Sequence, residues 1–560
     1  MKIRLFSKDR FLVLLLLILA VPTFSSLLRP GFFPMHDDMQ AMRLLQIDKC
    51  VKDLQIPCRW VPDMGYGYGY PQFNFYAPMP YYIMEAFHLV GLGFLDSVKA
   101  GFIASTIFAL VGMYLLGRFL WGKMGGAVSS FLYIYAPYRA VDFYVRGAVG
   151  ELWALAFLPF IFLYSAKSLE DGKKYKVLFA LSLASLLTSH NISALIFIPI
   201  LLLWFIFLLW YKKDSTSLKL KAKGFNFFTG LFWGFAISAF FVIPAWFEKN
   251  FVHIESLLGG YFNYINHFVG VRQLLFENQW GYGTSEVGPY DDILLSVGLI
   301  QWLLPLVVLI LLLILKRKKS FFLVLFFTLL GWIALFMAHS RSSFIWDKLY
   351  FLAILQFPWR FLIIATFLFS LASGSVSLLF KKVTAGYKLT FILLIVIGFM
   401  LYRSNFVPRI WIDISDSEKF SGDSWQRQQT ISIFDYLPIY AEKPPGSAAP
   451  NKPVAIEGRV GSIEGQKGTD WQIWNVEIES ETAILQLPLY YFPNWEVFVN
   501  GVKTPINYTN KLGLITFFLN QGSHEVKAEL RNTPVRVAGN TISIAGVIAV
   551  PIYLKKKKKT

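Results

Sequence analysis

Two adjacent carboxylates and a histidine stand near the start of the chain, in the run His36-Asp37-Asp38. A carboxylate at this place can act as general base on an acceptor hydroxyl, or hold a divalent cation that neutralises a phosphate leaving group. The alternative is structural, because an Asp before the apolar stretch 39–45 also suits the N-terminus of a helix. We take Asp37 and Asp38 as candidate catalytic residues and His36 as a candidate substrate ligand.

A segment rich in glycine and aromatic residues follows at 65–78. Its glycines and prolines break any spanning helix, whereas its aromatic rings suit the interface, so we expect it to lie in the membrane surface. Aromatic rings there can stack on the face of a sugar or line a lipid groove, and the alternative is a simple aromatic belt. The candidate substrate-binding residues of this segment are Tyr68, Tyr70, Asn74 and Tyr76.

Further polar residues stand at the outer ends of later predicted helices. Arg146 and Glu151 flank the turn between the third and fourth spans, and His190 and Asn191 lie at the end of the fifth. Ionisable groups at membrane depth are costly and raise a functional hypothesis by default. The alternatives are a structural Arg146–Glu151 pair and a satisfied buried histidine. Glu151 is a candidate catalytic residue, and the other three are candidate substrate ligands.

Two arginines precede or open the tenth predicted span on the outer side. Arg360 belongs to the run 356–360, Gln-Phe-Pro-Trp-Arg, and Arg341 lies before it in the same loop. An arginine held at the membrane surface can bind a lipid phosphate through two parallel hydrogen bonds. The alternative is an interfacial anchor, although arginine anchors prefer the inner side of the membrane. Both arginines are candidate substrate ligands.

The elements that must position these residues are membrane helices. The 560-residue chain is 55% hydrophobic and only 16% charged, which excludes an ordinary soluble protein. Apolar runs of helical length predict about twelve spans, the first of them retained rather than cleaved as a signal peptide. The predicted spans are 11–28, 98–117, 127–143, 150–166, 175–191, 194–211, 225–247, 291–315, 320–338, 359–380, 389–402 and 539–554.

The distribution of charge predicts the orientation of these spans. The formal net charge of the chain is +18. Every second short loop, beginning with residues 1–10, belongs to a set whose net charge is +23, and all the other residues together have a net charge of −5. Basic residues concentrate in cytoplasmic loops, so we expect both termini in the cytoplasm of a bacterial cell with a multi-pass protein in its plasma membrane. Because the basic residues are dispersed without stacking aromatics, nucleic acid is not an expected partner.

Three outer segments are large, at 29–97, 248–290 and 403–538. The last alternates apolar and polar residues and contains an Asn500-Gly501 pair suited to a type I′ hairpin, which predicts a small β-sandwich outside the membrane. The chain therefore divides into a membrane module at 1–402, a β domain at 403–538, and a last helix with a basic tail at 539–560. Cys50 and Cys58, in the first outer loop, form either a disulfide or two free thiols.

This arrangement resembles the GT-C superfamily of integral-membrane glycosyltransferases, in which paired acids follow the first span and an outer domain ends the chain. Within that group, several motifs look like those of the bacterial membrane family labelled "6-pyruvoyl-tetrahydropterin synthase-related". These motifs are His36-Asp37-Asp38, the glycine and aromatic residues of 67–76, Arg146-Gly147 with Gly150-Glu151, His190-Asn191, and 356–360. The similarity covers about residues 30–365, and the run 491–495 is similar to the outer domain of related membrane proteins.

The resemblance implies an inverting transfer of a sugar from a polyprenyl-phosphate donor to a hydroxyl of a lipid or envelope glycan. Asp37 or Asp38 would remove the acceptor proton, and Arg360, with Arg146 or Arg341, would hold the departing phosphate. Glu151 would orient the donor sugar or share a cation, Mg²⁺ or Mn²⁺, with the aspartates. No second acid stands at a D-x-D spacing from them, so a metal requirement stays open. The alternative functions are a flippase for lipid-linked glycans and a non-catalytic scaffold for envelope polymers.

Overall fold

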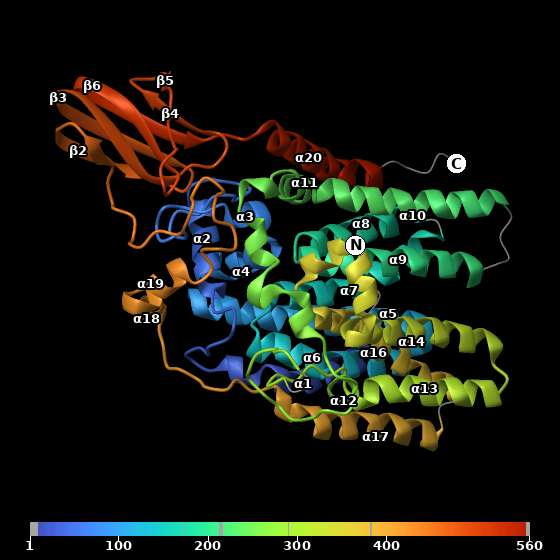
Figure 1. Ribbon diagram of the computed structural model, residues 1–560. Helices are drawn as coiled ribbons and strands as arrows, with labels where there is room; N and C mark the ends of the chain where they lie inside the picture. The colour runs from blue at the N-terminus through green and yellow to red at the C-terminus, as the bar shows by residue number, and fades with distance from the viewer. Residues whose placement is uncertain (1–8, 171, 212–216, 289–290, 381–383, 556–560) are drawn as a thin grey trace.

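The protein is a bundle of long helices with a β-sheet at one end (Figure 1). The computed structural model describes residues 9–170, 172–211, 217–288, 291–380 and 384–555. The bundle helices are α1 (Arg10–Ala20), α5 (Phe94–Ile134), α7 (Val149–Ser168), α8 (Lys173–Leu187), α9 (Asn191–Tyr211), α10 (Ser217–Ile237), α11 (Ala239–Phe247), α13 (Leu299–Ile314), α14 (Lys318–Ala338), α16 (Leu362–Ser373), α17 (Ala385–Tyr402) and α20 (Pro534–Lys555).

Among the described residues, seven helices are long and apolar enough to cross a membrane, or eight if α10 and α11 form one bent span. These helices are consistent with a multi-pass membrane protein, but the predicted count of twelve spans is not confirmed. Several predicted intervals hold helices that are shorter than the apolar run. The interval 291–315, for example, begins with extended chain, and its helix α13 has only 16 residues. Apolar length alone does not separate a spanning helix from buried extended chain.

Helix α5 consists of two antiparallel arms. Gly122 has a φ of 80°, outside the helical region, and interrupts the 41-residue helix. A Cβ on Gly117 would lie 2.8 Å from the Cα of Gly126, although nine residues of straight helix would separate them by about 13 Å. Ser130 Oγ also donates a hydrogen bond to the carbonyl of Leu110 at 2.8 Å. The arms occupy the predicted intervals 98–117 and 127–143, although the second arm ends at Ile134.

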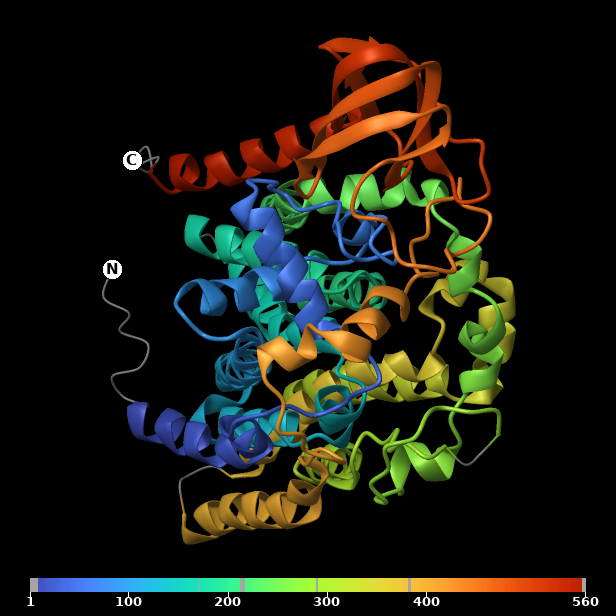
Figure 2. The same cartoon turned by 90° about the vertical axis from the view of Figure 1, so that its left-hand side faces the viewer.

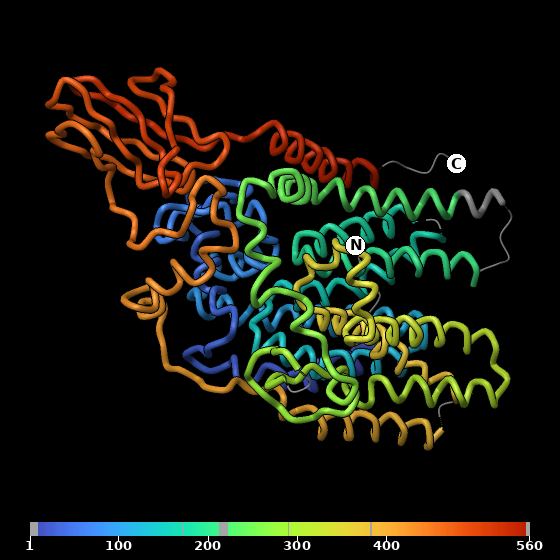
Figure 3. The backbone as a smooth tube through the Cα atoms, in the orientation of Figure 1, coloured from blue at the N-terminus to red at the C-terminus, as the bar shows by residue number. Residues whose placement is uncertain are grey.

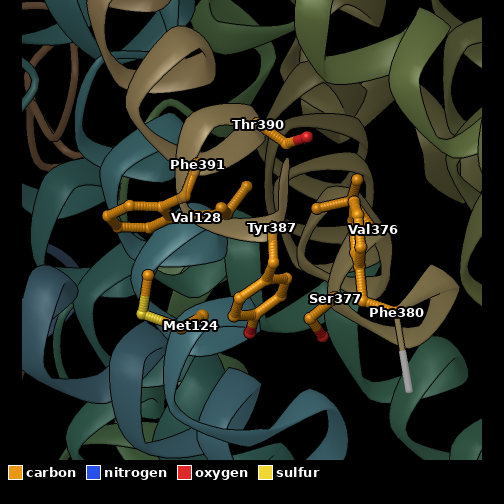
Figure 4. Close-up of a pocket in the computed structure, with 8 residues that line it drawn as sticks. All are labelled: Met124, Val128, Val376, Ser377, Phe380, Tyr387, Thr390 and Phe391. Carbon is orange, nitrogen blue, oxygen red and sulfur yellow. The ribbon is translucent and has the colours of Figure 1, made fainter. Parts of the chain in front are cut away.

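The basic turns that the structure describes, such as 316–319 between α13 and α14, lie at the end of the bundle opposite the sheet (Figure 3). Asp9, before α1, forms ion pairs of 2.7 Å and 2.5 Å with Arg118 and Lys123 beside the turn of α5. A shallow apolar pocket lies at this same end, between α17, the second arm of α5 and the 3-10 helix Gly374–Leu379 (Figure 4). It is therefore remote from the acids and arginines singled out in the sequence.

The C-terminal sheet is antiparallel and has six strands. They are β1 (Val454–Glu457), β2 (Val460–Lys467), β3 (Trp471–Tyr490), β4 (Trp495–Val499), β5 (Val502–Thr504) and β6 (Leu514–Leu530), in the order β1-β3-β6-β4-β5 with β2 also paired to β3. All six strands are hydrogen-bonded into one antiparallel sheet, so the β domain is present but its sandwich form is not confirmed. The long strands β3 and β6 bend at bulges instead. Asn500 and Gly501 both have positive φ and join β4 to β5, which confirms the predicted hairpin.

A layer of short helices covers the end of the bundle beside the sheet (Figure 2). It contains α2 (Gln40–Lys52), α3 (Gln72–Phe75) and α4 (Met79–Leu89). Residues 403–453, which we call the strap, run back across this layer and contain α18 (Asp416–Lys419) and α19 (Gly422–Thr430). Cys50 and Cys58 form a disulfide in this layer, with Cα atoms 5.6 Å apart.

A buried ion-pair network joins the sheet, the bundle and this layer. Arg536 Nε lies 2.9 Å from Glu248 Oε2, and both side chains are almost fully buried. Asn74 donates to the same carboxylate at 2.9 Å and accepts from Arg59 at 3.2 Å. Ion pairing and hydrogen bonding of this kind offset the free-energy cost of burying charged groups. The network therefore fixes where α20 and the sheet sit on the bundle.

A second buried acid, Glu85 on α4, lacks such partners. It is 2% exposed, and neither carboxylate oxygen has a hydrogen-bond partner among the described residues. Burial raises the pKa of Glu85 to about 7, and the nearby Asp48 on α2 adds to this shift. The ionised form is therefore disfavoured in the folded protein, and that penalty develops as pH rises from the unfolded pKa towards 7.

Replacing Glu85 by Gln should consequently stabilise the protein at alkaline pH. We expect a gain of about 2 kcal/mol in the free energy of unfolding above neutral pH and little change in acidic buffer. Thermal unfolding of the detergent-solubilised protein, followed by tryptophan fluorescence at both pH values, measures this. Glu457→Gln, on the exposed strand β1, is the control. An equal effect of Glu85→Gln at both pH values would contradict the predicted ionisation.

Candidate active site

The core of the candidate site is an ion-pair cluster between the second arm of α5 and α7. Arg146 binds Glu151 through two hydrogen bonds, from Nη1 to Oε2 and from Nη2 to Oε1, each 2.8 Å long. Arg146 also pairs with Asp142, one helical turn before it, and Tyr138 donates to Glu151 Oε2 at 2.9 Å. Gly147, at a φ of 66°, turns the chain so that α7 begins just before Glu151. The predicted structural pair is therefore present, within a larger cluster.

Arg360 joins this cluster from a distant part of the sequence. Its Nε lies 3.2 Å from Glu151 Oε1, and its Nη1 donates to the carbonyl of Leu355 at 2.6 Å and to Gln356 Oε1 at 3.0 Å. The guanidinium of Arg146 lies 4.5 Å from the ring centre of Trp359, so the run 356–360 packs on both arginines. Glu151, at 1% exposure, thus bridges two buried arginines.

The charge of this cluster is positive. Arg139 is also buried, and its electrostatic partners include Asp142, whose Oδ2 has no hydrogen-bond partner among the described residues. Three arginines, at positions 139, 146 and 360, thus stand against the two acids Asp142 and Glu151, which leaves one positive charge. A buried region with an excess positive charge favours an anion, and arginine suits a phosphate in particular.

His190 and Asn191 pack beside the cluster. His190 interacts electrostatically with Glu151 and Arg360, and burial lowers its pKa to about 4, so the imidazole is neutral. Its Nδ1 lies 2.7 Å from Ser193 Oγ at the start of α9. Asn191 donates to the carbonyl of Phe75 at 3.1 Å, which ties α9 to the aromatic segment. His190 therefore lies in the cluster, whereas Asn191 holds the neighbouring layer.

Backbone hydrogen bonds attach the first motif to the cluster. His36 N donates to the carbonyl of Val145 at 2.9 Å, and Asp37 N donates to the carbonyl of Arg146 at 3.0 Å. A Cβ on Gly147 would collide with Met35, so this close approach requires glycine. The structure thus brings together two motifs that lie more than one hundred residues apart in the sequence.

The two aspartates bind different cations. Asp37 Oδ2 accepts a hydrogen bond of 2.6 Å from Arg43 on α2, and Arg43 also donates to the hydroxyl of Tyr76 at 3.2 Å. Asp38 Oδ2 accepts a hydrogen bond of 2.8 Å from Lys419 of the strap. Burial raises the pKa of Asp38, and Lys419 opposes this shift. The side chains of Asp37 and Asp38 are 35% and 33% exposed, so a substrate can reach both.

The donor set does not fit a divalent cation. Among the described residues, no group of three or more His, Cys, Asp or Glu side chains is arranged to hold a metal ion. Asp37 and Asp38 turn to Arg43 and Lys419, and Glu151 is occupied by two arginines. Mg²⁺ and Mn²⁺ prefer several carboxylate or carbonyl oxygens around one centre.

Part of the predicted outer loop 248–290 covers the cluster on the side of Arg360. The ring of His267 lies 4.6 Å from that of Phe357, and the carbonyl of Leu257 accepts a hydrogen bond of 3.0 Å from Gln356. On the other side, His36 Nε2 lies 3.2 Å from the carbonyl oxygen of Tyr282. His36 is therefore a contact between this loop and the first motif.

Four predicted site residues lie elsewhere. Tyr68 packs against Tyr490 of the sheet, and Tyr70 is buried under the strap, with its hydroxyl donating to the carbonyl of Ser432. Asn74 belongs to the joint around Glu248. Arg341 is exposed at the surface, and no hydrogen bond or ion pair joins its side chain to Arg360 among the described residues. The structure therefore does not bring these four residues into the cluster.

Sequence reasoning missed several residues that complete the site. Asp142 precedes Arg146 by four residues, and this helical spacing was a usable signal. Arg43 and Tyr138 lie close in sequence to predicted residues but had no motif of their own. Lys419 had no local signal at all, because its partner Asp38 is 381 residues away in the sequence.

No protein-family model matches this chain. A protein of Lactococcus lactis subsp. cremoris (strain MG1363), described only as an uncharacterized protein, is 22% identical to it over 238 residues. The match covers 40% of this chain and 36% of that protein, so the chain spans about a third of its relative's length. The description of this relative gives no activity.

Proposed function

We propose that the protein is a GT-C-type membrane glycosyltransferase, with about twelve spans, that moves a sugar from a polyprenyl phosphate to an acceptor hydroxyl on the outer face. One observation carries this proposal: the main chain of Asp37, whose carboxylate is partly exposed, is hydrogen-bonded to Arg146 of a buried cluster with an excess positive charge. A base beside an anion site is the combination that this transfer requires.

The outer location of the site has its own support. Asp37 and Asp38 bind Arg43 of α2 and Lys419 of α18, which lie at the end of the bundle that carries the sheet (Figure 1), and Asp9 pairs with the basic turn of α5 at the other end. Basic turns favour the cytoplasm. The Cys50–Cys58 disulfide lies on the sheet side, and disulfides persist in oxidising compartments. Charge and disulfide therefore both support the proposal that the sheet side faces outward.

In the proposed reaction, Asp37 takes the proton of the acceptor hydroxyl as its oxygen attacks the anomeric carbon. The bond from this carbon to the phosphate oxygen breaks, and the configuration inverts. Arg360 and Arg146 hold the departing phosphate, and Glu151 keeps both guanidinium groups in place. Arg360 Nη2 donates no hydrogen bond among the described residues, so this group is available to a phosphate oxygen. Fixed positive charge at the leaving group lowers the barrier of the transfer.

The charge placement also separates this function from its alternatives. A flippase requires ionisable residues near the middle of the membrane, in broken helices of paired halves. Here the ionisable cluster is hydrogen-bonded to the first motif, which in turn binds α2 and the strap. A non-catalytic scaffold would not explain why two arginines are buried around one glutamate, since burying charged groups costs free energy.

Proteoliposomes that contain the purified full-length protein test the proposal. With a radiolabelled polyprenyl-phosphate sugar and a lipid-linked glycan acceptor, we expect label to appear in the acceptor. Labelled lipid that crosses the bilayer without transfer would support the flippase instead. No transfer over a panel of donor sugars and acceptors, together with no binding of polyprenyl phosphate, would contradict the glycosyltransferase.

Replacing Arg360 by Gln should weaken the binding of polyprenyl phosphate about tenfold to a hundredfold, because one charge-assisted contact to the phosphate is lost. Equilibrium binding of a fluorescent polyprenyl phosphate to the protein in nanodiscs measures this. Arg341→Gln is a matched control, since Arg341 is exposed and lies outside the cluster. Equal affinities of the two variants for polyprenyl phosphate would show that Arg360 does not bind the phosphate.

A further inference from the structure

Two aromatic rings pack against the two arginines of the cluster. The rings of Phe357 and Trp359 are stacked on each other, with centroids 4.8 Å apart and an angle of 25° between their planes. The guanidinium of Arg360 lies 4.9 Å from the ring centre of Phe357. The guanidinium of Arg146 lies 4.5 Å from the ring centre of Trp359. Trp359 is therefore a direct neighbour of a group that is proposed to hold the phosphate.

The turn that carries these rings has a strained backbone. Gln356 has a φ of 62° and a ψ of −45°, a conformation that a residue with a Cβ rarely adopts. Its side chain is bonded on both sides, from Nε2 to the carbonyl of Leu257 and from Arg360 Nη1 to Oε1, each at 3.0 Å. Strain of this kind persists only where the surroundings fix it, and it is common at ligand sites. The surroundings therefore set the place of Trp359 in the cluster.

The indole N–H of Trp359 is buried and unpaired. Trp359 is 3% exposed, and its Nε1 has no hydrogen-bond partner within the part of the chain that the structure describes. Leaving a buried donor unpaired costs free energy, so such a group in a folded protein calls for an explanation. The cluster is not sealed, because the side chains of Arg146 and Arg360 are 12% and 10% exposed. A ligand that reaches these arginines also approaches the indole ring.

We propose that Trp359 is a phosphate ligand, whose indole N–H donates a hydrogen bond to the phosphate held by Arg146 and Arg360. The inference deepens the proposed function and rests on it. An indole N–H donates and never accepts, so it suits an anion. It supplies this hydrogen bond without adding a further positive charge to a buried region that already contains three arginines. The chemistry that it recognises is a phosphate oxygen, either of a lipid or of free phosphate.

Replacing Trp359 by Phe should weaken the binding of polyprenyl phosphate about tenfold, because one hydrogen bond to a charged group is lost. Phe keeps an aromatic ring beside Arg146 and removes the N–H. Equilibrium binding of a fluorescent polyprenyl phosphate to the full-length protein in nanodiscs measures this. Trp153→Phe is the matched control and should keep the wild-type affinity. Trp153 is also buried with an unpaired Nε1 among the described residues, but its ring packs against Phe108 and Phe157.

Nuclear magnetic resonance of the wild type gives a second measurement. In protein that contains isotope-labelled tryptophan, the indole N–H signal of Trp359 is the one of 17 that is missing in Trp359→Phe. Polyprenyl phosphate should move this signal downfield, because the N–H gains a bond to an anion. Inorganic phosphate is the second probe. A shift with both probes assigns the site to phosphate in general, and a shift with polyprenyl phosphate alone assigns it to a lipid-linked phosphate.

The outcomes separate this inference from the proposed function. If polyprenyl phosphate moves the Trp359 signal while the wild type transfers no sugar, the phosphate ligand stands and the glycosyltransferase falls. If polyprenyl phosphate binds the wild type and Trp359→Phe equally and the signal does not move, the inference is overturned and the proposed function is unaffected. An equal loss of affinity in Trp153→Phe, with an unmoved Trp359 signal, also overturns the inference.

Discussion

Replacing Asp37 by Asn is expected to slow sugar transfer by about 10²- to 10⁴-fold, the usual contribution of a general base. Asn keeps the size of the side chain and still accepts a hydrogen bond from Arg43, but it cannot take the acceptor proton. The main-chain bond from Asp37 to Arg146 is also unaffected. Binding of polyprenyl phosphate should therefore stay close to that of the wild type, and transfer in proteoliposomes should be nearly lost.

Asp38→Asn is the informative comparison for this experiment. Asp38 is as exposed as Asp37, but it is paired with Lys419 of the strap and has no backbone bond to the cluster. We expect a loss of transfer that is at least tenfold smaller than for Asp37→Asn. A larger loss in Asp38→Asn, with normal transfer in Asp37→Asn, would assign the base to Asp38. Normal transfer in both variants would show that neither aspartate is the catalytic base.

Replacing Glu151 by Gln is expected to cost about 3–5 kcal/mol of stability, because it leaves Arg360 and Arg146 buried with one fewer negative charge. Glu151 accepts four hydrogen bonds in the cluster, two from Arg146 and one each from Tyr138 and Arg360. Gln cannot accept all of them, since one of its two polar atoms is a donor. Chemical or thermal unfolding of the protein in detergent micelles measures the loss.

A second substitution tests whether charge is the cause. In Glu151→Gln/Arg360→Gln, the excess positive charge created by the first change is removed, so part of the lost stability should return. The exposed Glu464→Gln on β2 should stay within about 0.5 kcal/mol of the wild type. A loss in the double variant equal to the sum of the two single losses would show that Glu151 and Arg360 do not interact.

Local sequence predicted much of the secondary structure for identifiable reasons. Long apolar runs indicated the helices, since helix satisfies the backbone polar groups within each segment. The Asn500-Gly501 hairpin was predicted because both residues adopt positive φ readily. The single bent sheet was not foreseen, because strand pairing depends on register over long distances and on bulges within β3 and β6. The count of twelve spans is not confirmed, and one reason is that apolar residues also fill extended chain before α13.

In the candidate site, too, contacts between residues close in the sequence were predicted, whereas contacts between distant segments were not. Pairs that are close in the sequence, such as Arg146 with Glu151, were expected from their spacing and are present. Tyr68 and Asn74 were chosen for side-chain chemistry alone, and the structure uses them in packing and in the joint around Glu248. The type of a residue limits the chemistry that its side chain can perform, and the groups around it in the folded protein determine whether that chemistry is possible.

The sequence by itself determined that this chain has the helices of a multi-pass membrane protein, and its composition and charge predict which end faces outward. Only the tertiary structure decided which polar residues meet. The backbone bonds from His36 and Asp37 to residues 145–146, the ion pair of Glu151 with Arg360, and the contact of the strap with Asp38 all join distant segments. The physical reason is that the hydrophobic pattern of a helix can be read within one segment of the sequence, because burial of apolar surface needs no particular partner. Ion pairs and main-chain hydrogen bonds are directional, so they depend on where the folded segments lie.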